Sequence, residues 1–335
     1  MIVDLSATTT SKIAKKITSL REQGGVNALG RVMTLVVITK NGLEEEAIEA
    51  ANLASREHPC RIIVVTDAGA DAPTRLDAQI RVGGDAGASE MIVLRGYGEL
   101  AGASESLIAG LLLPDAPIVA WWPHGAPANA GQISIGRIAH RRITDAANEA
   151  DPQQALAALR RSYTAGDTDL AWTRLTNWRI QLASILDQLD ASPITAVTVE
   201  GAPDSPSTTL LAAWLHRALG APVTILKQPA GSGIRGVRLY RAAGEIRLAR
   251  HGHGANGLTV TELTQPGQPL QRISLPPRTL QDCLTEELRR LGPDDVFGET
   301  LRSLEPGPAH QQIRSTVTRG AQTKLAQNRL ELVPA

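Results

Sequence analysis

The chain has 335 residues, and its 34 Lys plus Arg residues balance its 34 Asp plus Glu residues, so the net charge is zero. This balance argues against a nucleic-acid partner or an anionic membrane surface, because both usually require an excess of basic residues. The N-terminus lacks the apolar core and cleavage site of a signal peptide, and no apolar stretch reaches the roughly 18 residues of a membrane-spanning helix. We therefore expect a cytoplasmic protein.

Length and composition favour two domains with ordinary hydrophobic cores. Hydrophobic residues make up 42% of the chain and charged residues 20%, which is typical of globular proteins. A chain of this length exceeds what one compact core usually holds. The two cysteines, Cys60 and Cys283, are too few for a secreted disulfide framework, so we expect two reduced thiols.

The first half of the chain alternates predicted helices and strands. Residues 10–23 carry apolar side chains at i, i+4 and i+7, which indicates an amphipathic helix. Residues 34–39 form a β-branched run, typical of a strand buried on both faces. Asn41 followed by Glu44 resembles a capping box that starts the next helix. A second apolar strand at residues 61–66 completes a βαβ unit.

The same alternation continues to about residue 150. Further strands are predicted at residues 78–82, 90–95 and 117–122, with a helix near residues 100–112. Six alternating elements predict an α/β domain with a doubly wound, mostly parallel sheet over residues 1–150.

A polar stretch, which carries a short helix at residues 152–163, separates this domain from a second one at residues 166–305. The second domain is predicted to hold a mixed sheet with a group of antiparallel strands, and residues 311–335 form a polar C-terminal tail. We expect its helices at residues 170–189, 207–219 and 280–291, and its strands at residues 194–199, 222–226, 236–241, 244–250 and 258–263. Ser207 and Gly220 are the expected caps of the second of these helices.

The sequence contains almost no motif typical of a nucleotide-binding, metal-binding or catalytic site. Gly231 to Gly236 fits G-x-G-x-x-G, but a strand follows it, whereas dinucleotide binding needs a helix there. His251 and His253 could ligate a metal, yet no third ligand lies near them in the sequence. Nucleophile motifs are not found. We therefore expect no catalytic residue, no metal and no cofactor.

Two tryptophan-rich segments stand out. Trp121 and Trp122 alternate along a predicted strand, so one should point to each face of the sheet, and Pro123 ends the strand where ligands or partners dock on doubly wound sheets. One of the two is expected in the core, and the other either joins it or is an exposed anchor.

In the second segment, residues 166–179, Asp169 can cap a helix. Trp172 and Leu175 lie three residues apart, and Arg174 and Trp178 lie four apart, so a helix here would carry aromatic and cationic groups on adjoining faces. This pattern fits a binding hot spot or, equally, a core helix with arginine at its edge. The candidate partner-binding residues are Trp121, Trp122, His124, Asp169, Trp172, Arg174, Trp178 and Arg179.

An alternative interpretation is a sugar-phosphate or nucleotide-binding enzyme on the same α/β scaffold. Its anion site would combine a glycine-rich loop with a basic stretch, although the loop fits a simple turn and the arginines fit a solvated helix face. The candidate anion-binding residues are Gly83, Gly84, Ser89, Arg137, Arg141 and Arg142.

Several long segments resemble the actinobacterial glucose-6-phosphate dehydrogenase assembly proteins, the OpcA family. They are residues 28–39, 58–66, 75–94, 112–122, 135–145 and 166–179. The resemblance implies a non-enzymatic partner of glucose-6-phosphate dehydrogenase, the first enzyme of the oxidative pentose phosphate pathway, which promotes its assembly or activates it allosterically. It offers no catalytic residues.

In related cyanobacterial proteins, cysteines are associated with thioredoxin control. Here Cys60 and Cys283 fall in different predicted domains, which disfavours that switch. A third possibility is a structural scaffold that binds the dehydrogenase without changing its kinetics.

Overall fold

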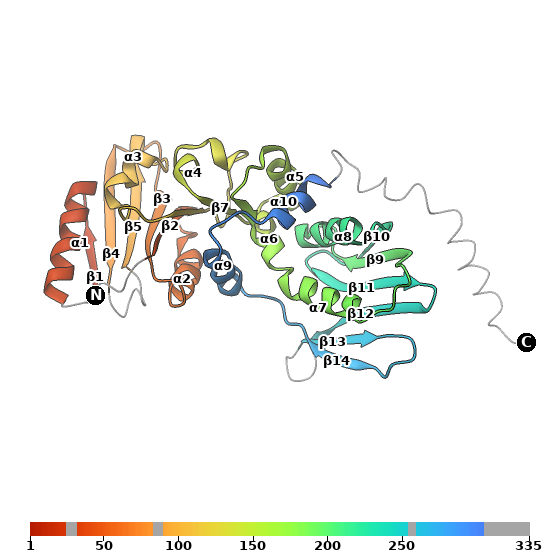
Figure 1. Cartoon of the computed structure of the whole chain (residues 1–335). Coiled ribbons are helices and arrows are strands. Elements are labelled where there is room, and N and C mark those ends of the chain that lie inside the picture. Colours follow the sequence, from red (N-terminus) through yellow and green to blue (C-terminus); the bar gives the residue numbers. More distant parts are fainter. Residues whose placement is uncertain (25–31, 83–89, 254–258, 305–335) are drawn as a thin grey trace, which may run out of the picture. The chain divides into compact units, whose positions relative to one another are not determined.

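The structure, a computed structural model, describes residues 1–24, 32–82, 90–253 and 259–304 (Figure 1). The chain divides into two compact units. Unit 1 comprises Met1–Ile180 together with Pro276–Glu299, and unit 2 comprises Gln181–Leu275 and the described residues from Thr300 on. The Gln181–Leu275 part of unit 2 thus interrupts unit 1 along the sequence. Both units combine helices with a β-sheet, which confirms the predicted α/β class.

This division differs from the expected boundary at residues 151–165. Residues 151–180 stay with unit 1, whose sheet takes in the last strand, Asp167–Asp169. A helix from late in the sequence, Leu280–Arg289, also returns to unit 1 and contributes apolar side chains to its core. A contact between segments so distant in sequence leaves no local signal.

Unit 1 contains one eight-stranded sheet. Its strands are β1 (Ile2–Leu5), β2 (Met33–Lys40), β3 (Cys60–Asp67), β4 (Arg75–Arg81), β5 (Glu90–Tyr97), β6 (Ile118–Trp121), β7 (Arg141–Thr144) and β8 (Asp167–Asp169). Its helices are α1 (Thr10–Gly24), α2 (Glu44–Ala54), α3 (Glu105–Ile108), α4 (Ser134–Ile138), α5 (Pro152–Ser162), α6 (Leu170–Thr173) and α9 (Leu280–Arg289). The helices α7 (Thr176–Asp187) and α10 (Asp295–Arg302) cross the division between the units.

The strand order is β1-β4-β5-β3-β2-β6-β7-β8. All neighbours from β5 to β8 are parallel, and the β1–β4 and β4–β5 pairs are antiparallel. From β2 the chain first builds the sheet toward β3 and β5, and then toward β6, β7 and β8. The direction therefore reverses between β2 and β6, and such a switch point is where doubly wound proteins commonly bind ligands.

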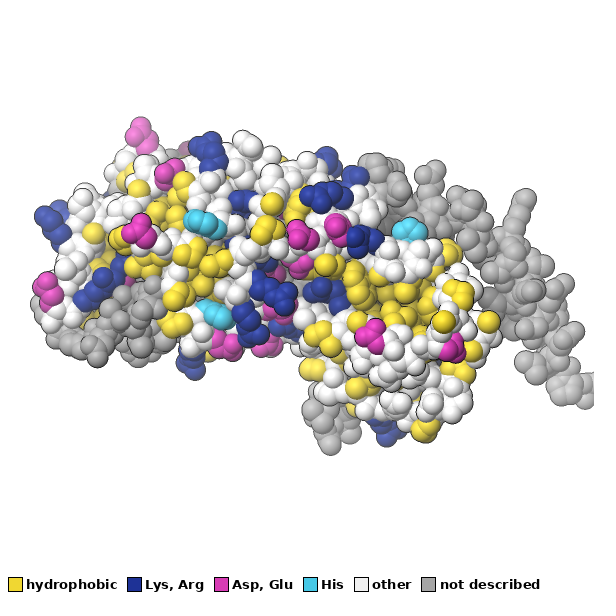
Figure 2. Space-filling view, viewed as in Figure 1, with side chains coloured by type: hydrophobic (Ala, Val, Ile, Leu, Met, Phe, Trp, Pro, Cys, Tyr) yellow, Lys and Arg dark blue, Asp and Glu magenta, His cyan; other side chains and the backbone are white. Residues whose placement is uncertain are grey.

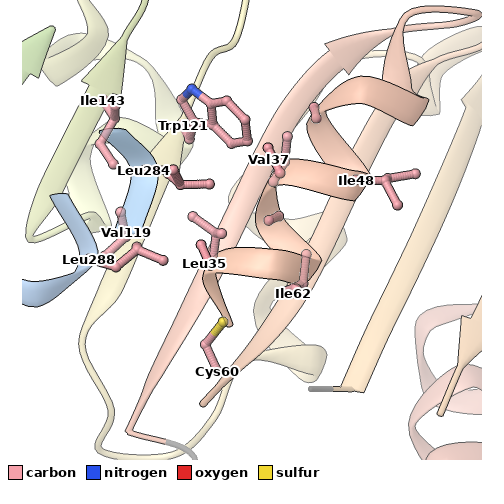
Figure 3. Close-up of a cluster of buried hydrophobic side chains, with 14 of the residues drawn as sticks. Leu35, Val37, Ile48, Cys60, Ile62, Val119, Trp121, Ile143, Leu284 and Leu288 are labelled. Atoms are coloured by element: carbon pink, nitrogen blue, oxygen red, sulfur yellow. The ribbon is translucent and has the colours of Figure 1, made fainter. Parts of the chain in front are cut away.

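Hydrophobic cores cover both faces of this sheet because its central strands are apolar on both sides. Leu35 and Val37 of β2 point into one core, and Val36 between them points into the other. Figure 3 shows the first core, in which Leu284 and Leu288 of α9 lie beside the strands. The helices α1 and α3 contribute to the second core.

Unit 2 contains a six-stranded mixed sheet. Its strands are β9 (Ala196–Gly201), β10 (Val223–Lys227), β11 (Ile234–Arg241), β12 (Gly244–His253), β13 (Thr259–Thr264) and β14 (Gln271–Ser274), in the order β10-β9-β11-β12-β13-β14. The β9–β10 pair is parallel and all other pairs are antiparallel, as the sequence predicted for β11, β12 and β13, whereas β14 was not predicted.

Helix α8 (Pro206–Leu219) connects β9 to β10. It ends, as predicted, at Gly220, whose φ of 62° is the left-handed conformation that glycine adopts easily. Its N-cap is Ser205 rather than the predicted Ser207, because Ser205 accepts the Thr208 N–H while Ser207 is buried inside the first turn.

Three further local predictions were wrong. Leu43, not Asn41, precedes α2, and no side chain caps that helix. The expected helix at residues 100–112 is a short α3 flanked by the 3-10 turns Gly98–Leu100 and Ala109–Leu111. The expected helix at residues 170–189 is broken at residues 174–175 into α6 and α7. No helix in the described part of the chain is long and apolar enough to span a membrane.

Candidate functional site

Trp121 and Trp122 lie on opposite faces of the unit 1 sheet, as their alternation predicted. Trp121 belongs to the core that α9 helps to fill (Figure 3), and Trp122 belongs to the core on the other side. The expectation that one of them could be an exposed anchor is wrong, since their exposed fractions are 0% and 2%. Both faces of the sheet are covered, so alternation alone does not expose a side chain.

His124 lies at the switch point, between the carboxyl ends of β2 and β6. Its Nε2 lies 2.8 Å from Thr39 Oγ1 and accepts the Lys40 N–H at 3.4 Å. Burial, followed by the nearby Lys40 ammonium, lowers the pKa of His124. The imidazole is therefore predominantly neutral near pH 7 and fixes the end of β2 to the loop after β6.

The first turn of α2 makes this switch point acidic. Glu44, Glu45 and Glu46 occupy that turn. The carboxylate of Glu44 accepts the Gly42 N–H at 2.6 Å and pairs with Arg95 at 3.4 Å. A helix N-terminus attracts a phosphate through its free N–H groups and its positive end. Here the first turn carries three carboxylates, whose negative charge disfavours a nucleotide phosphate at the switch point.

Asp169 is the N-cap of α6, as predicted. Its side chain accepts the Ala171 N–H at 2.9 Å, the Thr144 hydroxyl at 2.6 Å and the Ala146 N–H at 3.0 Å. Burial, and then the Asp145 carboxylate, raise the pKa of Asp169 to about 6. The side chain is 1% exposed, so its role in this conformation is internal.

Arg174 pairs with a buried carboxylate rather than with Trp178. Its two terminal nitrogens donate to the oxygens of Asp145 at 2.6 and 2.7 Å, a bidentate ion pair. The guanidinium that lies over an aromatic ring is that of Arg179, 3.8 Å from the centroid of Trp172. The break between α6 and α7 shifts the helical phase, so the spacing within one continuous helix predicted the wrong partners.

The tryptophans of residues 166–179 are interior residues. Trp172 donates its Nε1–H to Asp294 at 2.8 Å, and its ring lies 5.6 Å from that of Phe297. Trp172 and Trp178 are 1% and 2% exposed. They cannot reach a partner without local unfolding, so the core interpretation of this segment is correct for them.

The structure contradicts the predicted anion site at two of its residues, Arg141 and Arg142, which are buried and paired with carboxylates. Arg141 forms an ion pair with Glu287 and donates to the Gly292 carbonyl at 2.6 Å. Arg142 forms an ion pair with Asp167 and donates to the Ala139 and Ala165 carbonyls, at 3.0 and 2.8 Å. Both side chains lie on β7 and are buried, so neither the anion site nor the solvated helix face describes them.

The other members of that site do not join them. Arg137 is exposed on α4 and donates to the Gln132 carbonyl at 3.2 Å. Gly83, Gly84 and Ser89 lie outside the described residues, as does the predicted tail at residues 311–335.

Glu287 of α9 was missed by the sequence analysis, although it organises this region. Its carboxylate accepts from Arg141 and from the hydroxyls of Thr168 and Thr173. These partners lie 146, 119 and 114 residues away in the sequence, so no spacing rule could find them. This network links β7, β8 and α6 to α9 within unit 1.

A polar cavity of about 310 Å³ lies next to this network in unit 1. It is lined by Glu57, Asn177, Pro276, Pro277, Arg278, Asp282, Thr285, Glu286 and Arg289. Arg278 is held by Glu286 and by the Thr173 carbonyl, and Arg289 pairs with Glu57 at 3.3 Å. The arginines that line the cavity are thus already paired with carboxylates.

Both cysteines belong to unit 1 and to the same buried core, whereas the sequence placed them in different domains. Burial raises the pKa of Cys283 to about 11, and Cys60 is fully buried. A thiol with a raised pKa in an apolar core reacts slowly. Within the described ranges, no group of His, Cys, Asp and Glu side chains could hold a metal ion.

Family models match both halves of the chain. The glucose-6-phosphate dehydrogenase subunit N-terminal domain matches residues 51–161, and the corresponding C-terminal domain matches residues 165–301. The chain belongs to the OpcA family. The two matches of this OpcA-family protein meet between residues 161 and 165, close to the boundary expected from the sequence rather than to the division into compact units.

Similar solved structures show only a distant likeness to this OpcA-family protein. A 3-ketoreductase from Actinomadura kijaniata is 9% identical with a TM-score of 0.44, covering 81% of this chain and 94% of its own. The UDP-N-acetylglucosamine 3-dehydrogenase of Acidithiobacillus ferrooxidans is 9% identical with a TM-score of 0.36, covering 80% and 95%. At such values the likeness says nothing about activity. No curated protein matches the sequence significantly.

Proposed function

We propose that this OpcA-family protein binds glucose-6-phosphate dehydrogenase and, as a non-enzymatic assembly factor and allosteric activator, promotes its active oligomeric state. The observation that carries the proposal is the pair of family models, which together account for residues 51–161 and 165–301. Both are named for a subunit of that enzyme.

The electrostatics of unit 1 support a binding role over the alternative enzyme. A sugar phosphate or nucleotide needs uncompensated cations or free backbone N–H groups. Arg141 and Arg142 are buried and paired with carboxylates, and the first turn of α2 is acidic. The two arginines are therefore already compensated, and the acidic turn disfavours a phosphate.

Activation by such a protein is a matter of differential affinity. A binding partner shifts the dehydrogenase toward its active oligomer only as far as it binds that form more tightly than the inactive one. A preference of about 1–3 kcal/mol would change the equilibrium roughly 5- to 150-fold. All four candidate tryptophans are buried. The contacts that supply this preference must therefore come from other, exposed residues.

The test mixes the purified protein with the dehydrogenase of the same organism. We expect co-elution in size-exclusion chromatography and faster NADPH production, with a changed KM for glucose 6-phosphate or a changed kcat. Co-elution with unchanged kinetics would reduce the protein to a scaffold. Thermal stabilisation of the protein alone by glucose 6-phosphate or NADP would instead support the enzyme alternative and contradict the proposal.

A further inference from the structure

Strand β10 forms one edge of the unit 2 sheet. Among the described residues it pairs only with β9. Val197 N–H donates to the Pro222 carbonyl at 2.9 Å, and Gln228 N–H donates to the Gly201 carbonyl at 3.0 Å. Backbone directions alternate along a strand, so even-numbered residues face β9 and the odd-numbered ones, Val223, Ile225 and Lys227, present N–H and C=O groups to the free edge. Within the part of the chain that the structure describes, three backbone positions are therefore open to another strand.

The side chains at this edge are apolar on both faces of the sheet. Leu226 is 46% exposed and shares its face with the exposed Thr224. Ile225, on the side that α8 covers, is half-buried, and α8 carries Trp214, also half-buried. Trp214 is the one tryptophan of five that is not buried. Figure 2 shows hydrophobic side chains gathered on unit 2 next to α8, over the strands β9 and β11.

The opposite edge of the same sheet is protected. There β14 exposes Gln271, Arg272 and Ser274, the kind of polar and charged side chains that discourage pairing with another chain. By contrast, β10 has one lysine at its end and no other charge. An apolar edge strand next to α8, the helix that carries the half-buried Trp214, is suited to a protein partner.

Charge indicates what kind of partner fits. The segment of residues 206–227, which forms α8 and β10, contains no Asp or Glu. Its exposed ionisable side chains are His216, Arg217 and Lys227. A partner segment with acidic residues beside its apolar ones is therefore favoured. A second copy of this chain, which would bring like charges together across the edge, is disfavoured.

We propose that an extended segment of glucose-6-phosphate dehydrogenase, apolar at alternate positions and flanked by acidic residues, docks along β10 as an added strand. This inference rests on the proposed function, since it names where that partner binds. Backbone hydrogen bonds to the odd-numbered residues align the segment, and contacts with Leu226 on one face and Ile225 on the other select its sequence.

The test compares substitutions of two exposed leucines, one at each edge of the unit 2 sheet, by their affinity for the purified dehydrogenase. Leu226→Glu places a repelling carboxylate at the proposed site, and we expect the Kd to rise at least 10-fold. Leu270→Glu is the matched control, because Leu270 is 52% exposed and lies just before the opposite edge strand. It should bind within about twofold of the wild type. Thermal unfolding of each variant verifies the fold.

A second pair of variants tests the backbone contact separately. Lys227→Pro removes one outward N–H, which an edge strand tolerates, and Lys227→Ala removes only the charge. We expect the proline variant to bind several-fold more weakly than the alanine variant. Equal affinity of the two, or wild-type affinity of Leu226→Glu, would overturn the docking proposal while leaving the proposed function standing.

Failure of the wild-type protein to bind the dehydrogenase would overturn the proposed function itself, and the docking proposal with it. A wild-type dimer that Leu226→Glu dissolves would assign the edge to a second copy and overturn the docking proposal alone. Analytical ultracentrifugation of both proteins without the dehydrogenase decides this point.

Discussion

At the residue scale, buried charges distinguish unit 1 from an ordinary hydrophobic core. Arg141, Arg142 and Arg174 each meet a carboxylate inside the protein, and Asp169 holds the start of α6. Such pairs contribute little net stability when intact, but removing one partner leaves a charge buried without compensation. These buried charged groups determine which segments pack together, and they make the stability of the protein sensitive to substitution and to pH.

Asp169 should make stability depend on pH. Its folded-state pKa of about 6 lies above its ordinary value of 3.8, so the folded state binds a proton more tightly than the unfolded state. Stability from this group is therefore complete below pH 4 and is lost as the pH rises to about 6, by an amount on the order of 2–3 kcal/mol. Asp169→Asn should flatten this fall in melting temperature between pH 4 and 6, and an unchanged slope would contradict the assignment.

The two cysteines should be inert in the folded protein. Cys283 has a raised pKa and both thiols are buried, so little thiolate is present or accessible at pH 8. We expect no rapid reaction with 5,5′-dithiobis(2-nitrobenzoate) in native buffer and release of about two thiols per chain in denaturant. Rapid native reaction of either thiol would reopen a redox role.

At the scale of elements, α9 completes the core of unit 1 although it follows unit 2 in the sequence. Leu284 and Leu288 enter the core beside β2 and β6, and Glu287 binds Arg141, Thr168 and Thr173. The helix is well defined locally, because Thr279 and Asp282 form a capping box at its start.

Replacing Glu287 with Ala should destabilise the protein by about 3–5 kcal/mol, because Arg141 is left buried and unpaired. The exposed pair Arg289–Glu57 provides the control, and Arg289→Ala should cost less than about 1 kcal/mol. Urea unfolding measures both values. Similar midpoints for the two variants would show that the buried network does not hold α9 in place.

At the scale of the whole molecule, the Gln181–Leu275 part of unit 2 interrupts unit 1, so the first 180 residues are incomplete by themselves. We expect a fragment of residues 1–180 to lack a cooperative thermal transition, since part of its core would face water. The same fragment joined to residues 276–299 through a flexible Gly/Ser linker should regain it. Cooperative melting of the shorter fragment would contradict this organisation.

Sequence patterns predicted the regular parts of both units. Continuous β-branched runs mark β2 and β3, and glycine turns mark the antiparallel strands from β11 to β13. The patterns failed where polar residues are buried: β7 and β8 carry arginine and aspartate whose partners lie on other elements. The burial of Trp121 could not be predicted, because α9, the helix that packs into the same core, is more than 150 residues away in the sequence.

The central claim is that this chain shifts glucose-6-phosphate dehydrogenase toward its active oligomer. Mass photometry of the dehydrogenase, diluted until its oligomer partly dissociates, measures this most directly when the protein is titrated in. We predict that the oligomer fraction rises and saturates together with the rate of NADPH formation. An unchanged distribution of masses across the titration, with or without a change in rate, would contradict the account.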